Sequence, residues 1–121
     1  MQGEQDAKHE ESASAYAANL KLLRDRLAED LGLKPTDLPL VFGLVLPGKS
    51  GGKKFVGRDI IHQQMRAADQ DSGAPEAIQR CKIVDTTDMS MRSDNVHFDS
   101  PGQLALGRGL AVAMRHLRTS N

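Results

Sequence analysis

The chain has 121 residues, the size of one ordinary domain, and its 16 basic and 16 acidic residues give a formal net charge of zero. This balance supplies no field for nucleic acid or an anionic membrane surface, and one Tyr, three Phe and no Trp leave few stacking platforms for bases or sugars. A single cysteine, Cys81, excludes an internal disulfide and a thiolate metal site, and we expect it in the core.

Nothing in the sequence resembles a membrane span or a leader. No apolar run approaches the roughly 20 residues that a span requires. The N-terminal residues MQGEQDAKHEES are acidic and polar, without the hydrophobic region of a signal peptide. The sequence therefore predicts no membrane partner and no export signal within this chain. If the chain is a piece of something longer, this says nothing about location.

The first predicted elements are a helix over residues 10–31 and a strand over residues 38–46. Apolar side chains in the helix recur at spacings of four, three, four and four, with Gly32 as its C-terminal cap and Pro35 as a stop. The run LPLVFGLVL is short and rich in branched residues, which favours a strand buried on both faces of a parallel sheet. The expected inward residues of the helix are Tyr16, Leu20, Leu23, Leu27 and Leu31.

The second half of the chain repeats this alternation. After a loop over residues 47–57 we expect a helix over 58–69, a short strand over 81–84 and a helix from 100 to about 118 that Ser100 caps, with Pro101 at its first position. The inward residues are Ile60, Ile61, Met65 and Ala68 in the first of these helices, and Leu106, Leu110, Met114 and Leu117 in the second. Alternating helices and strands indicate a layered α/β domain. Because no strand precedes the first helix, the domain resembles a truncated one.

The stretch GLVLPGKS, residues 43–50, fits the phosphate-loop pattern G-x-x-x-x-G-K-[ST] letter for letter. Such a loop must curl so that backbone N–H groups converge on phosphate, and a helix must begin at its Lys-Ser pair. Here the variable positions continue the buried strand, and Gly-Gly-Lys-Lys follows Ser50. Asp85, at the end of the second strand, would suit magnesium no better than any Asp after a buried strand. We therefore expect no nucleotide.

Asp94 and His97 lie three residues apart in a loop that leads into the last helix. Hydrolysis by a serine requires an imidazole to accept the hydroxyl proton, and a carboxylate on the other ring nitrogen fixes its tautomer. The spacing alone also fits a turn-capping Asp and an ordinary loop His. The other histidines, His9, His62 and His116, have weaker claims, and none falls at a metal-binding spacing with acidic partners, so we expect no metal.

Two blocks add to this reading. Residues 94–114, DNVHFDSPGQLALGRGLAVAM, resemble the closing block of SGNH-type esterases, especially the sialate O-acetylesterase-like carbohydrate esterases. That block reads D-x-x-H-F, a small residue, Gly-Gln, and a helix with Leu-Gly-x-Arg. Residues 2–7, QGEQDA, are similar to the W-x-Q-G-E-x-D-A block of the same family. The resemblance spans nearly the whole chain.

The resemblance implies a three-layer α/β/α SGNH (flavodoxin-like) fold with a parallel sheet, of which residues 1–121 would be a single partial domain, the C-terminal part. It implies a serine hydrolase that removes acetyl groups from sugar hydroxyls without a cofactor. By the same resemblance His97 is the general base, Asp94 orients it, and Gln2 is the oxyanion donor, with Gly3 and Glu4 beside it. Parent enzymes of this kind are commonly exported.

One departure from the family pattern decides what to expect of this chain. The nucleophile block has no counterpart, because none of the eight serines lies in a G-x-S-x-G or G-[DQ]-S setting, and Ser50 is only the least poor substitute. We expect the isolated chain to be inactive. The alternative is a truncated, inactive domain that serves as a carbohydrate-binding or interaction module, although scarce aromatics count against sugar binding. The acetylated sugar and the oligomeric state stay open.

Overall fold

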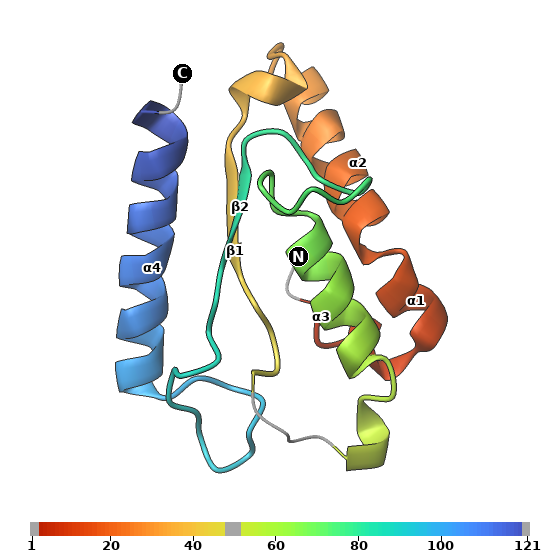
Figure 1. Ribbon diagram of the computed structural model, residues 1–121, viewed down its shortest axis with the longest axis vertical. Coiled ribbons are helices and arrows are strands. Elements are labelled where there is room, and N and C mark those ends of the chain that lie inside the picture. The colour runs from red at the N-terminus through yellow and green to blue at the C-terminus, as the bar shows by residue number, and fades with distance from the viewer. Residues whose placement is uncertain (1–2, 48–51, 120–121) are drawn as a thin grey trace.

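The computed structural model describes residues 3–47 and 52–119 of the chain. Two parallel strands form its centre, β1 (Leu40–Gly43) and β2 (Cys81–Val84), paired from Leu40 opposite Cys81 to Gly43 opposite Val84. Helices flank this pair on both sides (Figure 1). On one side is α4 (Ser100–Thr119), and on the other are α1 (Glu10–Ser14), α2 (Tyr16–Asp30) and α3 (Arg58–Ala67). The predicted α/β class with parallel strands is confirmed.

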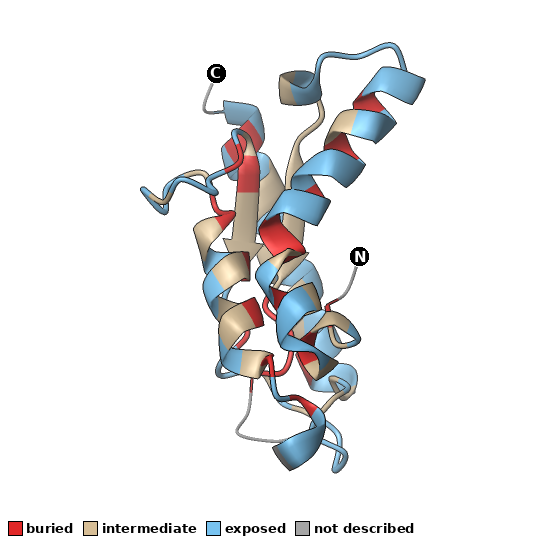
Figure 2. Cartoon of the chain, turned by 90° about the vertical axis from the view of Figure 1, so that its right-hand side faces the viewer, coloured by how far each residue is buried: buried red, intermediate tan, exposed pale blue. Residues whose placement is uncertain are grey.

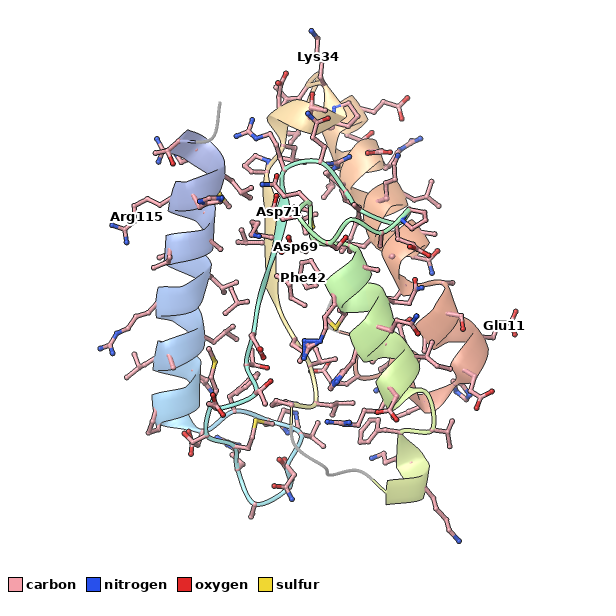
Figure 3. All side chains as sticks on the ribbon, viewed as in Figure 1. Glu11, Lys34, Phe42, Asp69, Asp71 and Arg115 are labelled. Carbon is pink, nitrogen blue, oxygen red and sulfur yellow. The ribbon has the colours of Figure 1, made fainter. Side chains whose placement is uncertain are left out.

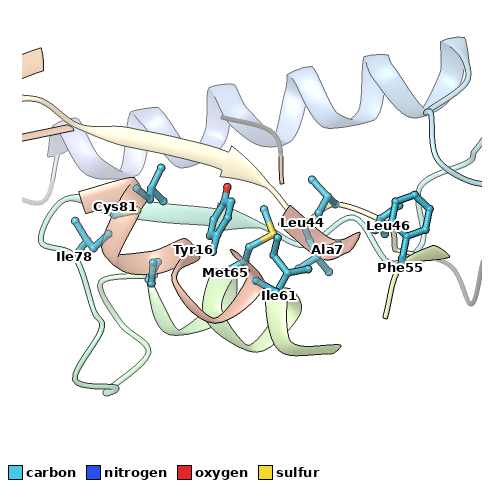
Figure 4. Close-up of a cluster of buried hydrophobic side chains, with 14 residues drawn as sticks. Ala7, Tyr16, Leu44, Leu46, Phe55, Ile61, Met65, Ile78 and Cys81 are labelled. Carbon is cyan, nitrogen blue, oxygen red and sulfur yellow. The ribbon is translucent and has the colours of Figure 1, made fainter. Parts of the chain in front are cut away.

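The main hydrophobic core fills the space between the strands and α1–α3 (Figure 4). The Tyr16 ring lies across from Phe42 of β1, with ring centroids 6.4 Å apart, and Ile61 and Met65 of α3 close the cluster. Cys81 is fully buried among these side chains, as predicted. Two strands alone make a marginal sheet, so the helical cover stabilises this one.

The first predicted helix is broken and turns a different face to the core. It divides at Ala15, next to Ser14, whose hydroxyl donates to the Glu10 carbonyl, a bond that bends helices. Gly32 is the C-terminal cap as predicted: its φ is +66°, and the next N–H returns to the carbonyl of Ala28 at 2.8 Å. The buried residues of α2 (Figure 2) are Tyr16, Ala17, Leu20, Arg24 and Ala28.

Three of the five predicted inward residues of this helix are wrong, because Leu23, Leu27 and Leu31 are exposed. The buried stripe is displaced by about one residue and includes Arg24, which is 3% exposed and donates through Nη1 to the Gln79 carbonyl at 2.6 Å. A buried charged side chain whose partners are a distant backbone carbonyl and the neighbouring Asp25 carboxylate leaves no mark in a hydrophobic pattern. Periodicity therefore chose the neighbouring leucine stripe.

The predicted strand over residues 38–46 is too long, since β1 contains only Leu40–Gly43. The following residues are buried without being a strand, and Leu46 adopts a left-handed φ of 51°. Side chains take the place of a neighbouring strand by binding the carbonyls of this segment. They are Thr86 on Leu44 at 2.6 Å, His62 on Val45 at 2.7 Å and Arg58 on Leu46 at 3.1 Å.

The remaining elements are close to their predictions. The strand Cys81–Val84 is confirmed, and α3 ends at Ala67 with Ile61, Met65 and the adjoining Ala68 fully buried. In α4 the predicted stripe faces the strands, although Leu117 is its one fully buried member in the described part of the chain.

The predicted cap of α4 is wrong. Asp99 caps the helix, its carboxylate accepting the Gly102 N–H at 2.8 Å, so Ser100 is the first helical residue and Pro101 the second.

An acidic residue joins the end of α3 to the second strand. Asp69 is 8% exposed, accepts the Ile83 N–H at 2.9 Å and pairs with the Lys82 ammonium at 2.9 Å. Asp71 adds a second contact to the same ammonium at 2.9 Å, and Figure 3 shows both aspartates beside β2. The pairing satisfies the buried carboxylate and fixes the loop after α3 against the sheet.

We predict that Cys81 resists thiol reagents in the folded chain. Burial raises the pKa of the Cys81 thiol to about 12, so almost none of it is the reactive thiolate at pH 8. Its rate with a disulfide reagent at pH 8 should be at least about a hundred-fold lower than in urea-unfolded chain, as followed by absorbance. Equal rates in the two states would contradict the position of β2 in the core.

Candidate active site

The loop between β2 and α4 lies beyond the carboxyl ends of both strands (Figure 1), where parallel α/β domains usually place their sites. Its backbone forms a short hairpin. Met91 and Phe98 form an antiparallel bridge, and the Arg92 N–H donates to the His97 carbonyl at 2.8 Å. Asn95, at φ +56°, turns the chain at the tip. The hairpin thereby brings residues 94 and 97 to one end of the loop.

At this tip the side chains of Asp94 and His97 meet. Asp94 Oδ2 lies 2.7 Å from His97 Nδ1, while Oδ1 accepts the backbone N–H groups of Val96 at 2.9 Å and His97 at 3.0 Å. Both side chains remain open to solvent, with 46% of Asp94 and 69% of His97 exposed. The carboxylate is thus held by the backbone of its own turn before it meets the ring.

The hydrogen bonds decide the charge of Asp94 and the tautomer of His97. The bond from the His97 ring, then the N–H groups of His97 and Val96, hold the pKa of the Asp94 carboxyl well below its usual value. Their stabilisation is present above the ordinary carboxyl pKa and is lost as pH falls through the lowered folded value. An ionised carboxylate can only accept, so Nδ1 carries the proton and Nε2 of the neutral ring is a free acceptor.

Two adjoining cavities open beside His97. One, of about 470 Å³, is lined by Asp94, Val96 and His97 together with Glu4, Lys8 and Phe55. The second, of about 290 Å³, is lined by His97, Phe98 and residues at and just beyond the end of β1. Glu4 lines both. Glu4 of the N-terminal block and His97 of the hairpin, 93 residues apart in sequence, therefore share one site.

Gly3 anchors the N-terminal block at a position that has no room for a side chain. Its φ is +112°, and a Cβ there would lie 3.1 Å from Ile61, 3.2 Å from Tyr16 and 3.4 Å from Val45. The Ala7 N–H donates to the Gly3 carbonyl at 3.0 Å, and the Ala7 carbonyl accepts the Gly57 N–H at 2.8 Å. Close backbone packing against the core thus holds Glu4 at the cavities.

Other residues singled out by the sequence are not brought to this site. His62 is half-buried with Nε2 2.7 Å from the Val45 carbonyl, and burial lowers the pKa of its ring. His9 is exposed just before α1, and His116 is exposed on α4. Gln2 and Ser50 lie outside the described residues. Among the side chains described as lining the two cavities, none belongs to a serine.

The phosphate-loop pattern does not have the required helix within the described residues. β1 ends at Gly43, and the first α-helix after it begins at Arg58, while Lys49 and Ser50 lie outside the described part. Asp85 is turned to its own loop, where its carboxylate accepts the Thr87 N–H at 3.0 Å.

Within residues 3–47 and 52–119, the acidic residues, the histidines and the cysteine do not gather into a metal centre. That part of the chain holds no group of three His, Cys, Asp or Glu residues able to bind a metal ion. In the same residues, no helix is both long and apolar enough to cross a bilayer.

The family of the chain follows from a match that covers both blocks. Residues 1–116 match the family model described as carbohydrate esterase, sialic acid-specific acetylesterase. The chain belongs to this family. Neither the curated proteins nor the solved structures contain a match to it. The family description indicates an ester hydrolase whose substrates are carbohydrates, and the match includes Gly3, Glu4, Asp94 and His97.

The sequence did not predict part of the lining of the larger cavity. Lys8, Lys54 and Phe55 line the larger cavity but lie in short 3₁₀ segments and a loop, η1 (Asp6–Lys8) and η3 (Gly52–Lys54), whose letters carry no periodic signal. The capping role of Asp99 had a visible signal, because the three residues before Gly102 read Asp-Ser-Pro and Asp is as good an N-cap as Ser.

We predict that Asp94 sets the tautomer of His97. In ¹⁵N NMR spectra at neutral pH, the neutral ring of the wild-type chain should carry its proton on Nδ1. Asp94→Ala should make that tautomer the minor form, because the ring loses its ionised acceptor. Asp88→Ala, which removes an exposed carboxylate from the same loop, should leave the spectrum unchanged. A His97 tautomer that is insensitive to Asp94 would contradict the pairing.

We predict that Gly3→Ala is more destabilising than Gly73→Ala. Both positions have positive φ, but a Cβ at Gly73 meets nothing within 4 Å. Urea unfolding should show a loss of about 1–2 kcal/mol for Gly73→Ala from backbone strain alone. Crowding against the core should add at least about 1 kcal/mol for Gly3→Ala. Equal losses would mean that the N-terminal block is not packed as described.

Proposed function

We propose that this chain is the C-terminal part of a carbohydrate O-acetylesterase domain of the SGNH type, with a three-layer α/β/α fold. In this proposal His97 is the general base and Asp94 fixes its orientation and tautomer. The observation that carries the proposal is the 2.7 Å contact between Asp94 Oδ2 and His97 Nδ1, beside two cavities and within a chain of the esterase family.

The proposed reaction follows from the tautomer. With Nδ1–H directed to Asp94, Nε2 of His97 takes the proton of a serine hydroxyl as the serine oxygen attacks the acetyl carbonyl. The imidazolium, stabilised by the Asp94 carboxylate, then gives this proton to the departing sugar oxygen. In the second half of the reaction Nε2 deprotonates a water that attacks the acetyl-enzyme, and acetate leaves with the serine hydroxyl restored.

The developing negative charge on the carbonyl oxygen requires donors close to His97. We propose Gln2 as a side-chain donor, since Gly3 and Glu4, the next two residues, are packed at the cavities. Glu4 borders both cavities, so we place it against the substrate rather than against the reacting carbonyl.

The serine is the part of this mechanism that we assign to residues outside the chain. None of the described side chains lining the cavities is a serine hydroxyl, and no serine in the sequence has the surroundings of the family nucleophile. The same observation supports a second candidate, an inactive domain that retains the scaffold as a carbohydrate-binding or interaction module. The coding sequence upstream of Met1 separates the two: an in-frame Gly-Ser turn, and a Trp codon just before the Q-G-E block, favour the enzyme.

We predict that the 121-residue chain alone hydrolyses p-nitrophenyl acetate no faster than its His97→Ala variant, because a base without its nucleophile has nothing to activate. In a longer gene product that supplies the serine, His97→Ala should lower kcat by about 10³-fold or more. His9→Ala is the matched control, because His9 is exposed and is not among the residues that line either cavity. Turnover by the short chain that disappears in His97→Ala would disprove the assignment of the nucleophile, and undiminished kcat in the longer product would disprove the role of His97.

A further inference from the structure

The Asp94–His97 hairpin is connected to α4 through one carboxylate. We propose that Asp99 is a positioning residue, which ties the base of the hairpin to the start of α4 and so holds the imidazole of His97 in place. The catalytic importance of this positioning rests on the proposed function. The contacts of Asp99 with the hairpin and α4 are independent of that function.

Three contacts converge on Asp99. Its Oδ1 accepts the Ser90 hydroxyl and the Gly102 N–H, the latter at 2.8 Å, and its own N–H lies 3.4 Å from the Ser90 carbonyl. Ser90 begins the hairpin and Gly102 belongs to the first turn of α4. One carboxylate oxygen therefore joins the two ends of the hairpin and the helix that follows it.

The contacts continue as a ladder from Asp99 to the tip. The Met91–Phe98 bridge lies next to the Ser90–Asp99 pair, followed by the Arg92 N–H on the His97 carbonyl at 2.8 Å. The Asn95 N–H then closes the turn on the Arg92 carbonyl at 2.9 Å. Because His97 is two residues from Asp99 along this ladder, a displacement at its base reaches the imidazole directly.

Gly102 packs so closely that the hairpin and the first turn of α4 have no room to move toward each other. A Cβ at Gly102 would lie 2.1 Å from the Ser90 carbonyl oxygen, so the first turn of α4 touches the backbone of the hairpin. The Gln103 side chain adds a bond to the Phe98 carbonyl at 3.2 Å. The 20-residue helix thereby acts as a rigid support for the short loop.

The electrostatics agree with this role. The Ser90 hydroxyl, then the Gly102 N–H, hold the pKa of the Asp99 carboxyl below its usual value. The carboxylate also lies at the positive end of the α4 dipole. Asp99 is therefore ionised at neutral pH, and the hydrogen bonds that it accepts from Ser90 and Gly102 are charge-assisted.

The simpler interpretation is that Asp99 only caps α4. The two interpretations differ for Ser90, which touches the carboxylate but donates nothing to the helix. Under capping alone, Ser90→Ala leaves the hairpin unchanged. Under positioning, Ser90→Ala loosens the hairpin while the helix keeps its cap.

The test uses the whole chain and needs no turnover. ¹⁵N NMR reports the His97 tautomer, and amide hydrogen exchange at Arg92 and Asn95 reports the ladder. Asp99→Ala should mix the His97 tautomers and speed exchange at both amides by about ten-fold or more relative to amides in the middle of α4. Ser90→Ala should do the same to a smaller extent. Asp99→Asn should stay much closer to wild type than Asp99→Ala, because its amide oxygen accepts both donors and Asn is an equal N-cap, with only the charge assistance lost.

Gly32→Ala is the control for general destabilisation. Its φ of +66° strains an alanine, and it directly follows the C-terminal end of α2, which lies at the opposite end of the molecule from the loop before α4 (Figure 1). It should lower overall stability and leave both readouts at their wild-type values. The proposal is overturned if Asp99→Ala and Ser90→Ala leave the His97 tautomer and the two exchange rates unchanged, or if Gly32→Ala alters them as much. Loss of esterase activity in His97→Ala of a longer product tests the proposed function separately.

Discussion

The hydrogen bond from Nδ1 of His97 to Asp94 is the interaction on which the account of this chain depends. The carboxylate is first fixed by two backbone N–H groups of its own turn, so it meets the ring already oriented and ionised. Its charge assigns the proton of the neutral ring to Nδ1 and leaves Nε2 as an acceptor, and His97 lines both cavities. Every chemical step proposed here uses that free nitrogen.

The backbone around the pair is arranged to keep it at the cavity. At the N-terminal block, Gly3 packs directly on the core, and at the other end Gly102 brings α4 into contact with the hairpin. Segments from both ends of the chain therefore meet beyond the strands, where Glu4 and His97 border the same two cavities. A side chain at Gly3 would push the N-terminal block away from the core, and one at Gly102 would push α4 away from the hairpin.

The sequence predicted the element order, the parallel strands and the two blocks that match the esterase family, because apolar periodicity and motif letters record these features. It did not predict the buried face of α2, because that face includes Arg24, whose buried guanidinium donates a hydrogen bond to a carbonyl 55 residues away. The end of β1 was missed for a related reason: side chains of Thr86, His62 and Arg58 bind the carbonyls that a strand would have paired. Long-range hydrogen bonds of this kind leave no local pattern.

The most direct test of the central claim is a crystal structure of a domain that contains both this chain and its nucleophile, in which one distance is measured. We predict that Nε2 of His97 lies within about 3.2 Å of a serine Oγ, with Nδ1 still bonded to Asp94. A ring that has turned away from Asp94, or an Nε2 bonded to the protein interior with no serine in reach, would contradict it.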